Sequence, residues 1–291
     1  MKSTTLLAMA LAVLPAAGCG NKTPTTANTD IKVVMVDSAP LDPEHALWGR
    51  QMDVTVDVLP QQVTFPTLKE GTVKKLNIRA LADKQWLALR IEWEDPSPEN
   101  MLETDKFTDG VAIEFPLGDV TKTNPMMGDP QNPVYLVHWK AAWQRDQDQG
   151  RADVQDLHPG YWADPYPFVA GGHPYPVQES FESANSRRYL PAVAAGNPVS
   201  KISRQWPVEE LQAEGFGSLA DHRFQDARAK GAWANGKWRV VLMLPRISSD
   251  PANPKFADKM STSVAFAVWD GKAKNVGGRK HWAPFTNLVM P

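Results

Sequence analysis

Hydrophobic and polar residues alternate with a period of two along much of this chain, which is the pattern of β-strands. Strands are expected at residues 52–58, 73–80, 86–93, 110–117, 133–141, 227–233, 237–245 and 261–269, and the alternation is clearest at 52–58 and 86–93. Short turns join some of them, with Asp83-Lys84 between one pair and Asn235-Gly236 between another. We therefore predict a mainly β fold, an antiparallel β-sandwich with a few peripheral helices and long loops.

Two stretches depart from this alternation. Residues 143–206 are rich in Pro, Gly, Tyr, Asp and Gln and show no clear period. Loops of that length are more often functional than idle, and we expect this span to cover a binding site or to dock a partner. Residues 207–215 begin with Pro and end with Gly, which predicts a short helix with the Glu209-Glu210 pair on its solvated face.

The C-terminal hairpin has an unusual pair of faces. Val264, Phe266 and Val268 alternate with Ala265, Ala267 and Trp269, so one face of this strand carries small residues. After the turn at Asp270-Gly271, the segment Arg279-Lys280-His281-Trp282 opens the return strand. Because neighbouring strand residues point to opposite faces, only one of Lys280 and His281 can face a given pocket.

The N-terminus reads as a targeting segment. Lys2 precedes an apolar run at residues 6–14 that is too short to span a bilayer, and small residues lead into Cys19. This pattern resembles a bacterial lipoprotein signal, and an ordinary secretory signal with an incidental cysteine is the alternative. We expect residues 1–18 to be a signal peptide, Cys19 to be lipidated, residues 20–30 to be a flexible tether, and residues 31–291 to form the binding domain.

Composition removes several classes of function. The chain has 291 residues with a formal net charge of -2 and no basic stripe, so nucleic-acid binding has little support. Eleven Trp supply a substantial core, and 25 Pro with 19 Gly indicate many turns. A single cysteine excludes an intramolecular disulfide, a Cys-based zinc or iron–sulfur site, and covalent haem attachment through Cys-x-x-Cys-His.

Two weak candidates for metal chemistry remain. Met126 and Met127 lie together in a Pro/Gly/Asp loop, where a methionine is structural or is a soft ligand suited to haem iron. Lys280 is a solvated edge charge or a ligand, and as a ligand it must be neutral, which from a pKa near 10.4 costs about 4.6 kcal/mol at pH 7. His138, on the strand after the Met pair, is the alternative haem ligand.

Motifs of common enzymes are absent from the sequence. It contains no Gly-x-Ser-x-Gly elbow, no Gly-rich phosphate loop and no His-Glu-x-x-His, and its six histidines show no metal-ligand spacing. A hydrolase therefore has less support than the haem-ligand candidates.

The order of several segments resembles a known family. The segments are residues 109–116, 125–128, 133–141, 195–200, 207–217, 236–238 with 245–246, and 265–271 with 278–280. Together they are similar to the haem b-binding gamma subunits of periplasmic molybdenum enzymes such as ethylbenzene and dimethyl sulfide dehydrogenases and chlorate and selenate reductases. That family has a β-sandwich fold, in agreement with the strand pattern.

The resemblance implies a cofactor, ligands and partners. The family holds haem b non-covalently between a methionine and a lysine, which match Met127, with Met126 as the alternative methionine, and Lys280 here. It implies an electron-transfer subunit with no catalytic site of its own. Its partners would be an iron–sulfur beta subunit, a molybdenum-containing alpha subunit, and a soluble cytochrome or membrane redox partner.

Cys19 departs from the soluble gamma subunits and implies a protein anchored at the periplasmic face, at the outer membrane. The alternatives from other classes are a carbohydrate-binding β-sandwich lipoprotein, with Tyr161, Trp162 and Tyr166 stacking on sugars, and a cofactor-free assembly lipoprotein.

Overall fold

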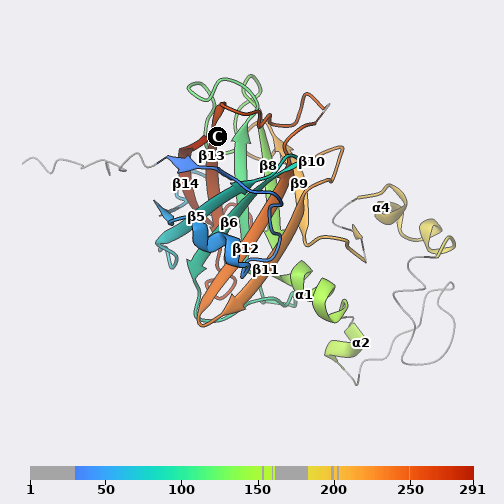
Figure 1. The fold of residues 1–291 in the computed structure, drawn as a ribbon. Coiled ribbons are helices and arrows are strands. Elements are labelled where there is room, and N and C mark those ends of the chain that lie inside the picture. The colour runs from blue at the N-terminus through green and yellow to red at the C-terminus, as the bar shows by residue number, and fades with distance from the viewer. Residues whose placement is uncertain are drawn as a thin grey trace, which may run out of the picture.

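Two β-sheets form the body of the protein, layered one on the other (Figure 1). The computed structural model describes residues 30–152, 154–158, 160, 183–197, 200–201, 203–248 and 250–291. The predicted signal peptide, Cys19 and nearly all of the predicted tether lie outside the described residues. Within those that are described, no helix is long and apolar enough to cross a membrane.

The larger sheet has eight strands in the described part of the chain, in the order β1-β14-β13-β7-β8-β9-β10, with β4 also paired to β14. Its strands are β1 (Ile31–Lys32), β4 (Leu59–Pro60), β7 (Gly110–Pro116), β8 (Val134–Lys140), β9 (Val208–Ala213), β10 (Ala220–Asp221), β13 (Ser261–Trp269) and β14 (His281–Val289). All pairs are antiparallel except β1 with β14, where the start of the described chain runs parallel to its last strand.

The smaller sheet has six strands in the described residues, in the order β11-β12-β6-β5-β2, with β3 also paired to β5. Its strands are β2 (Val34–Met35), β3 (Val54–Asp57), β5 (Lys75–Ala82), β6 (Trp86–Glu94), β11 (Arg228–Ala234) and β12 (Lys237–Pro245). The mainly β sandwich is therefore confirmed. Both sheets are mixed rather than purely antiparallel, because β2 also pairs in parallel, with β5.

The helices are short and lie beside the sheets. They are η1 (Ala46–Arg50), α1 (Ala141–Gln149), α2 (Val154–Leu157), η2 (Ser186–Arg188) and α4 (Pro191–Ala194). Figure 1 shows α1, α2 and α4 to one side of the sandwich. The absence of clear elements predicted from residue 143 onward is wrong at α1, which follows β8 directly and buries Ala141, Ala142 and Trp143.

The core between the sheets is built by the strand alternation read from the sequence. Three fully buried tryptophans, Trp93, Trp139 and Trp238, meet at its centre with ring centroids 5.0–6.4 Å apart. Trp93 and Trp238 belong to the smaller sheet and Trp139 to the larger one. Aromatic pairs of this kind add about 0.5–1.5 kcal/mol beyond the area they bury, so the cluster ties the two layers together.

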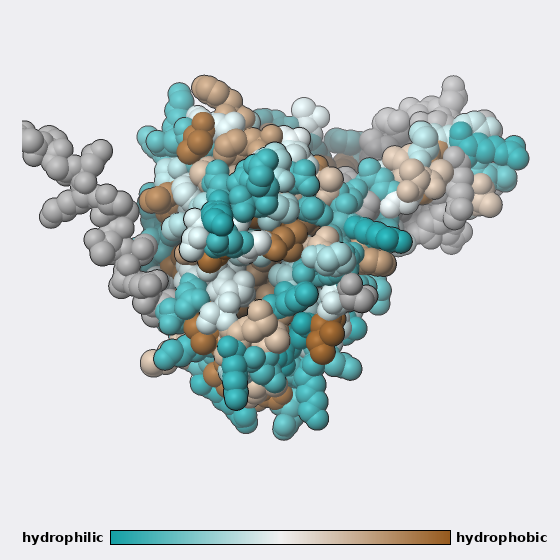
Figure 2. Space-filling model, turned by 90° about the horizontal axis from the view of Figure 1, so that it is seen from above, coloured by the Kyte–Doolittle hydropathy of each residue, from teal (hydrophilic) through white to brown (hydrophobic). Residues whose placement is uncertain are grey.

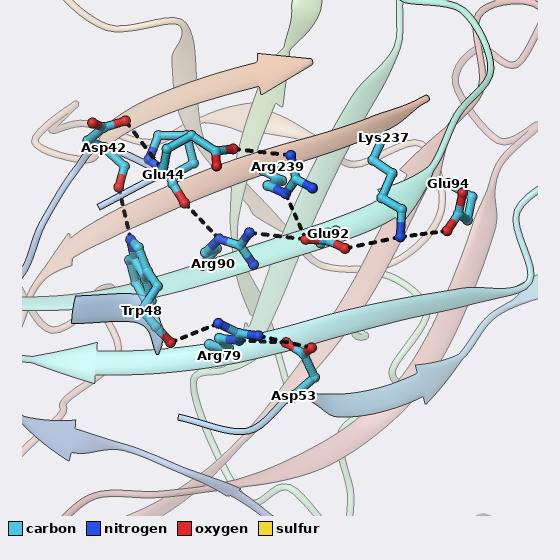
Figure 3. A network of polar contacts seen from close by, with 11 residues as sticks. Asp42, Glu44, Trp48, Asp53, Arg79, Arg90, Glu92, Glu94, Lys237 and Arg239 are labelled. Atoms are coloured by element: carbon cyan, nitrogen blue, oxygen red, sulfur yellow. Dashed lines mark hydrogen bonds and ion pairs between the residues drawn. The ribbon is translucent and has the colours of Figure 1, made fainter. Parts of the chain in front are cut away.

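The outer face of the smaller sheet carries a network of charged side chains (Figure 3). Glu92 on β6 accepts hydrogen bonds from Arg90 at 3.0 Å and Arg239 at 2.9 Å, and Lys237 lies 3.5 Å from its other oxygen. Beside it, η1 lays Trp48 over buried apolar residues of the same face. The charged network and η1 therefore cover this outer face of the smaller sheet, which we call the closed face.

The prediction of a helix at residues 207–215 is wrong. Residues Val208–Ala213 form β9, and Glu209 and Glu210 are buried instead of solvated. Each carboxylate has partners: Lys140 lies 2.7 Å from Glu209, and the backbone N–H of Ala227 donates to Glu210. Ion pairing and hydrogen bonding compensate burial in the strand, and neither is visible in the local pattern.

The surface shows mostly scattered apolar groups. From above the view of Figure 1, hydrophobic residues stand as small separate groups among hydrophilic ones (Figure 2). No large continuous apolar patch is visible on that face. On that face, the apolar side chains therefore form no continuous surface large enough to mark a binding site.

Candidate functional site: a cavity on the outer face of the larger sheet

A cavity of about 720 Å³ opens on the outer face of the larger sheet. Its floor comes from the small residues of two neighbouring strands, Ala265 and Ala267 of β13 and Gly110 and Ala112 of β7. The alternate residues of β13, including Phe266, point into the sandwich core. The volume lies within the range of about 300–1,000 Å³ typical of small-molecule and cofactor pockets.

Strand register arranges the floor in rows. Ala267 is paired with Trp282 on one side and with Ala112 on the other, and His138 and Glu209 continue the same row. Paired residues of antiparallel strands share a face, so one row runs from an aromatic ring, over two methyl groups, to a polar cluster. The predicted small-residue face of β13 is thus the bottom of a site.

Met127 lies at one wall, in an uncommon backbone conformation. Its φ is 75°, and Gly128 after it has φ 65° with the carbonyl of Asn132 too close for any side chain. The Met127 carbonyl accepts a hydrogen bond from Gly215 at 2.8 Å, and its N–H donates to Glu114 at 3.4 Å. Non-glycine residues with positive φ need such support and are found at functional sites.

Lys280 reaches into the cavity from the other side. Strand β14 begins two residues later than expected, at His281, and Lys280 lies at the end of the preceding turn. Its Nζ is 3.9 Å from Sδ of Met127. His281 points the opposite way, where its Nε2 accepts hydrogen bonds from the N–H groups of Thr72 and Val73. The sequence rule that only one of the two faces the pocket is confirmed.

Glu114 of β7 is a buried carboxylate beside this pair. Its Oε2 accepts the Met127 N–H, while Oε1 has no hydrogen-bond partner among the described residues. Burial raises the pKa of Glu114, and the charge of Lys280 partly opposes that rise. Burial likewise lowers the pKa of Lys280, against the pull of Glu114. The cavity therefore favours the uncharged form of the Lys280 amine, and one oxygen of Glu114 remains able to accept a hydrogen bond.

His138 lies at the other end of the floor, in a polar cluster. Its Nδ1 is 3.3 Å from Glu209, which also pairs with Lys140 at 2.7 Å. Its ring stacks on Trp269 with centroids 4.6 Å apart. Burial lowers the pKa of His138, although Glu209 pulls it up. The neutral ring thus donates Nδ1–H to Glu209.

All four residues predicted as binding residues line this cavity: Met126, Met127, Lys280 and His138. Of the described residues in 143–206, none lines it, so the expectation that this span covers the site has no support from its described part. Tyr161, Trp162 and Tyr166 lie outside the described residues. The sequence analysis gave no role to Glu114, although a lone charge within the apolar run Val111–Phe115 is a readable signal.

A two-sheet β-sandwich with a ligand-sized, largely apolar cavity on one outer face defines a ligand-binding β-sandwich protein. The chain belongs to the ethylbenzene dehydrogenase family, whose sequence model matches residues 45–281. That match covers β3 to β13 and ends at His281, the first residue of β14, so it includes every cavity-lining residue except Trp282.

Named relatives agree with the family. The chain is 24% identical to the chlorate reductase subunit gamma of Ideonella dechloratans, over 94% of this chain and 90% of that protein. It is 26% identical to the dimethylsulfide dehydrogenase subunit gamma of Rhodovulum sulfidophilum, over 83% and 71%. A putative respiratory nitrate reductase heme subunit of Haloferax mediterranei is 21% identical over 86% and 68%.

Solved structures show only a distant likeness. A carbohydrate-binding module of family 9 from Caldicellulosiruptor kristjanssonii aligns over 89% of this chain and 95% of its own, with 8% identity and a TM-score of 0.39. At that level the likeness carries no argument about function.

Proposed function

We propose that this protein binds haem b non-covalently in the cavity, with Met127 and Lys280 as axial ligands, and passes electrons for a molybdenum oxidoreductase complex. The observation that carries the proposal is the meeting of a thioether and an amine from segments 153 residues apart, at 3.9 Å. Family membership and the heme subunit among the relatives support the choice of cofactor.

The distance suits a shared metal ion. Nitrogen and sulfur ligands lie about 2.0–2.3 Å from a first-row metal, so two opposite ligands are about 4.3–4.4 Å apart. From 3.9 Å, the two side chains have to separate by only about 0.5 Å, within the freedom of a lysine rotamer. The small residues Gly110, Ala112, Ala265 and Ala267 leave room for a flat macrocycle beside them.

The amine has to be neutral to bind iron. The intrinsic cost of deprotonation, about 4.6 kcal/mol at pH 7, is reduced because burial lowers the pKa of Lys280. Glu114 acts in the opposite direction while no metal charge is present. With a positive iron centre in place, the same carboxylate is a nearby counter-charge.

When bound, haem supplies reversible one-electron chemistry at iron. The role of the protein is to hold the haem and to shield it from water. Met127 is fixed by two backbone hydrogen bonds, Lys280 by the final hairpin, and the apolar floor excludes water from both. A thioether ligand and a dry site both favour a raised reduction potential.

The partner part of the proposal comes from the relatives, which are gamma subunits by name. We assign this chain no catalytic site of its own. It would exchange electrons with an iron–sulfur beta subunit of a complex whose alpha subunit carries molybdenum, and with a soluble cytochrome or membrane redox partner. Exposed apolar side chains at the cavity rim, Phe65, Leu102, Phe216, Leu219 and Val276, offer contact surface near the cofactor.

The location of the protein is a separate part of the proposal. The leader pattern before Cys19 supports export and lipidation, with the domain held at the periplasmic face of the outer membrane. Labelling cells with a radioactive fatty acid tests it: the wild-type protein incorporates label, and a Cys19→Ala protein does not. Label in neither protein would leave the export signal without an anchor.

Spectroscopy of the purified protein tests the cofactor. Reconstituted wild-type protein should show a Soret band and the spectrum of six-coordinate haem. Met127→Ala and Lys280→Ala should each lose haem or shift to a spectrum with one axial ligand changed. Each removes one ligand and leaves the other in place.

Met126→Ala is the matched control, because Met126 lines the same cavity one residue away. It should keep the wild-type ligation. Wild-type spectra in both the Met127 and Lys280 variants would contradict the ligand assignment, and a protein that never takes up haem would contradict the cofactor.

A further inference from the structure

The Lys280 side chain needs contact with another residue to hold its amine in one position. It has four flexible carbons, and in the described part of the chain its Nζ has one hydrogen-bond partner, the weak acceptor Sδ of Met127. The charge of Glu114 also acts on the amine, and the indole of Trp269 lies beside it, with its ring centroid 5.3 Å from Nζ. Fixing a free lysine costs about 2 kcal/mol of rotamer entropy, so a rigid indole that limits its rotamers should measurably strengthen its binding to a metal.

Trp269 also ties down the turn that delivers Lys280. Its Nε1–H donates to the carbonyl of Gly277 at 3.0 Å. Gly277 lies inside a tight turn in which Val276 and Arg279 exchange two backbone hydrogen bonds, of 3.1 and 3.0 Å. Lys280 follows Arg279 directly. One side chain therefore contacts both the amine and the turn from which the lysine starts.

His138 supports the indole of Trp269. The two rings stack with an interplanar angle of 29°, and Glu209, itself paired with Lys140, lies 3.3 Å from Nδ1 of the imidazole. Gly110 makes this packing possible, since a Cβ there would lie 3.2 Å from Nε2 of His138 and 3.8 Å from the indole. The result is a continuous stack from a buried ion pair to the ligand amine.

We propose that Trp269, supported by His138, is the positioning residue that holds the Lys280 amine against the thioether. This rests on the proposed function. His138 then acts through Trp269 and is not itself an axial ligand. With the indole removed, Lys280 samples other rotamers, and the iron position it occupies becomes open to added ligands.

The test compares reconstituted Trp269→Leu and wild-type protein by haem spectrum, reduction potential and affinity for added imidazole. Trp269→Leu should bind imidazole about tenfold more tightly, the effect of ~1.4 kcal/mol of lost amine positioning. Trp269→Phe keeps the aromatic wall and loses only the Nε1–H, so it should move in the same direction by less. His138→Leu should resemble Trp269→Leu in its effect on imidazole affinity.

Trp282→Leu is the matched control. It removes an indole from the same cavity, and in the described structure Lys280 makes its hydrogen bond to Met127 and its cation–π contact to Trp269 rather than to Trp282. It should weaken haem binding through lost apolar contact, while the bound haem keeps the wild-type ligand spectrum and imidazole affinity. A merely structural effect would appear equally in Trp282→Leu and Trp269→Leu.

Two results overturn the inference. One is a folded Trp269→Phe or Trp269→Leu protein with the spectrum, potential and imidazole affinity of the wild type. The other is a His138→Leu spectrum that shows a lost axial ligand together with an unchanged Lys280→Ala protein. Failure of the wild type itself to take up haem would instead overturn the proposed function, so the two failures are distinguishable.

Discussion

The two outer faces of this sandwich treat the same side chain in opposite ways. On the smaller sheet, both oxygens of Glu92 have cationic partners, and although burial alone raises its pKa, the contacts with Arg239 and Arg90 outweigh that and lower it. On the larger sheet, Glu114 keeps one oxygen without a hydrogen-bond partner among the described residues, and burial raises its pKa. The two glutamates therefore differ in how their oxygens are paired, and the cationic partners of Glu92 decide the direction of its pKa shift.

The largest expected effect comes from filling the open face. Ala267→Phe puts a ring onto the cavity floor and should weaken haem binding more than about hundredfold, or ~3 kcal/mol, while thermal unfolding of the haem-free protein changes little. The measurement is a haem titration followed at the Soret band.

An Ala→Phe substitution on the closed face should instead lower the stability of the fold and leave haem binding unchanged. Ala88 is fully buried beneath the cluster that contains Trp48, so Ala88→Phe should cost about 1–3 kcal/mol of unfolding free energy and leave haem affinity per folded molecule intact. If both variants lose haem equally, the contrast between the faces is wrong.

A second effect concerns pH, at the connection between the two sheets. Asp95, just after β6, is buried, its Oδ2 has no hydrogen-bond partner among the described residues, and burial raises its pKa to about 6. A raised carboxylate pKa gives stability that is fully present below the unfolded value near 3.8 and is lost as pH rises through 6. Relative to Asp95→Asn, the wild type should lose about 2 kcal/mol between pH 4 and pH 7, after allowance for solvent screening.

Urea unfolding of both proteins at several pH values measures this difference. The opposite trend is expected from Glu92, whose lowered pKa gives stability that is lost as pH falls. A flat difference between wild type and Asp95→Asn across this range would show that Asp95 is ionised in the folded protein without cost.

The smallest effect sharpens the contrast within the closed face. Glu92→Gln leaves Arg90 and Arg239 with a neutral acceptor in a partly buried network and should cost about 2 kcal/mol of unfolding free energy. Asp53→Asn, in the more exposed pair with Arg79, should cost only about 0.5 kcal/mol. Equal losses in the two proteins would mean that burial does not set the strength of these pairs.

Much of the fold was predictable because the alternation of a strand is a property of its local sequence. Residues 86–93 and 237–245 became β6 and β12 nearly to the residue, and the hairpin at Asn235-Gly236 was predicted correctly. Strand β9 was mistaken for a helix because Pro207 and Gly215 resemble helix boundaries. The groups that permit Glu209 and Glu210 in a buried strand, such as Lys140 and Ala227, are far away in sequence.

The candidate site was predicted in a different way. The Met loop and a lone lysine gave only weak candidates by themselves, and the family resemblance joined Met127 and Lys280 into one proposed site. Sequence reasoning missed the stack of His138 on Trp269, because it depends on the register of β13 with β7 and of β7 with β8. Registers between distant strands are set by the whole sheet and by turn geometry.

The order of the two proposed ligands along the chain has a consequence for biogenesis. Lys280 is synthesised long after Met127, so a nascent chain that already carries the thioether loop still lacks the amine. Under the proposed ligation, haem can be captured only once the hairpin with Lys280 has been made, and a product truncated before that hairpin should accumulate colourless.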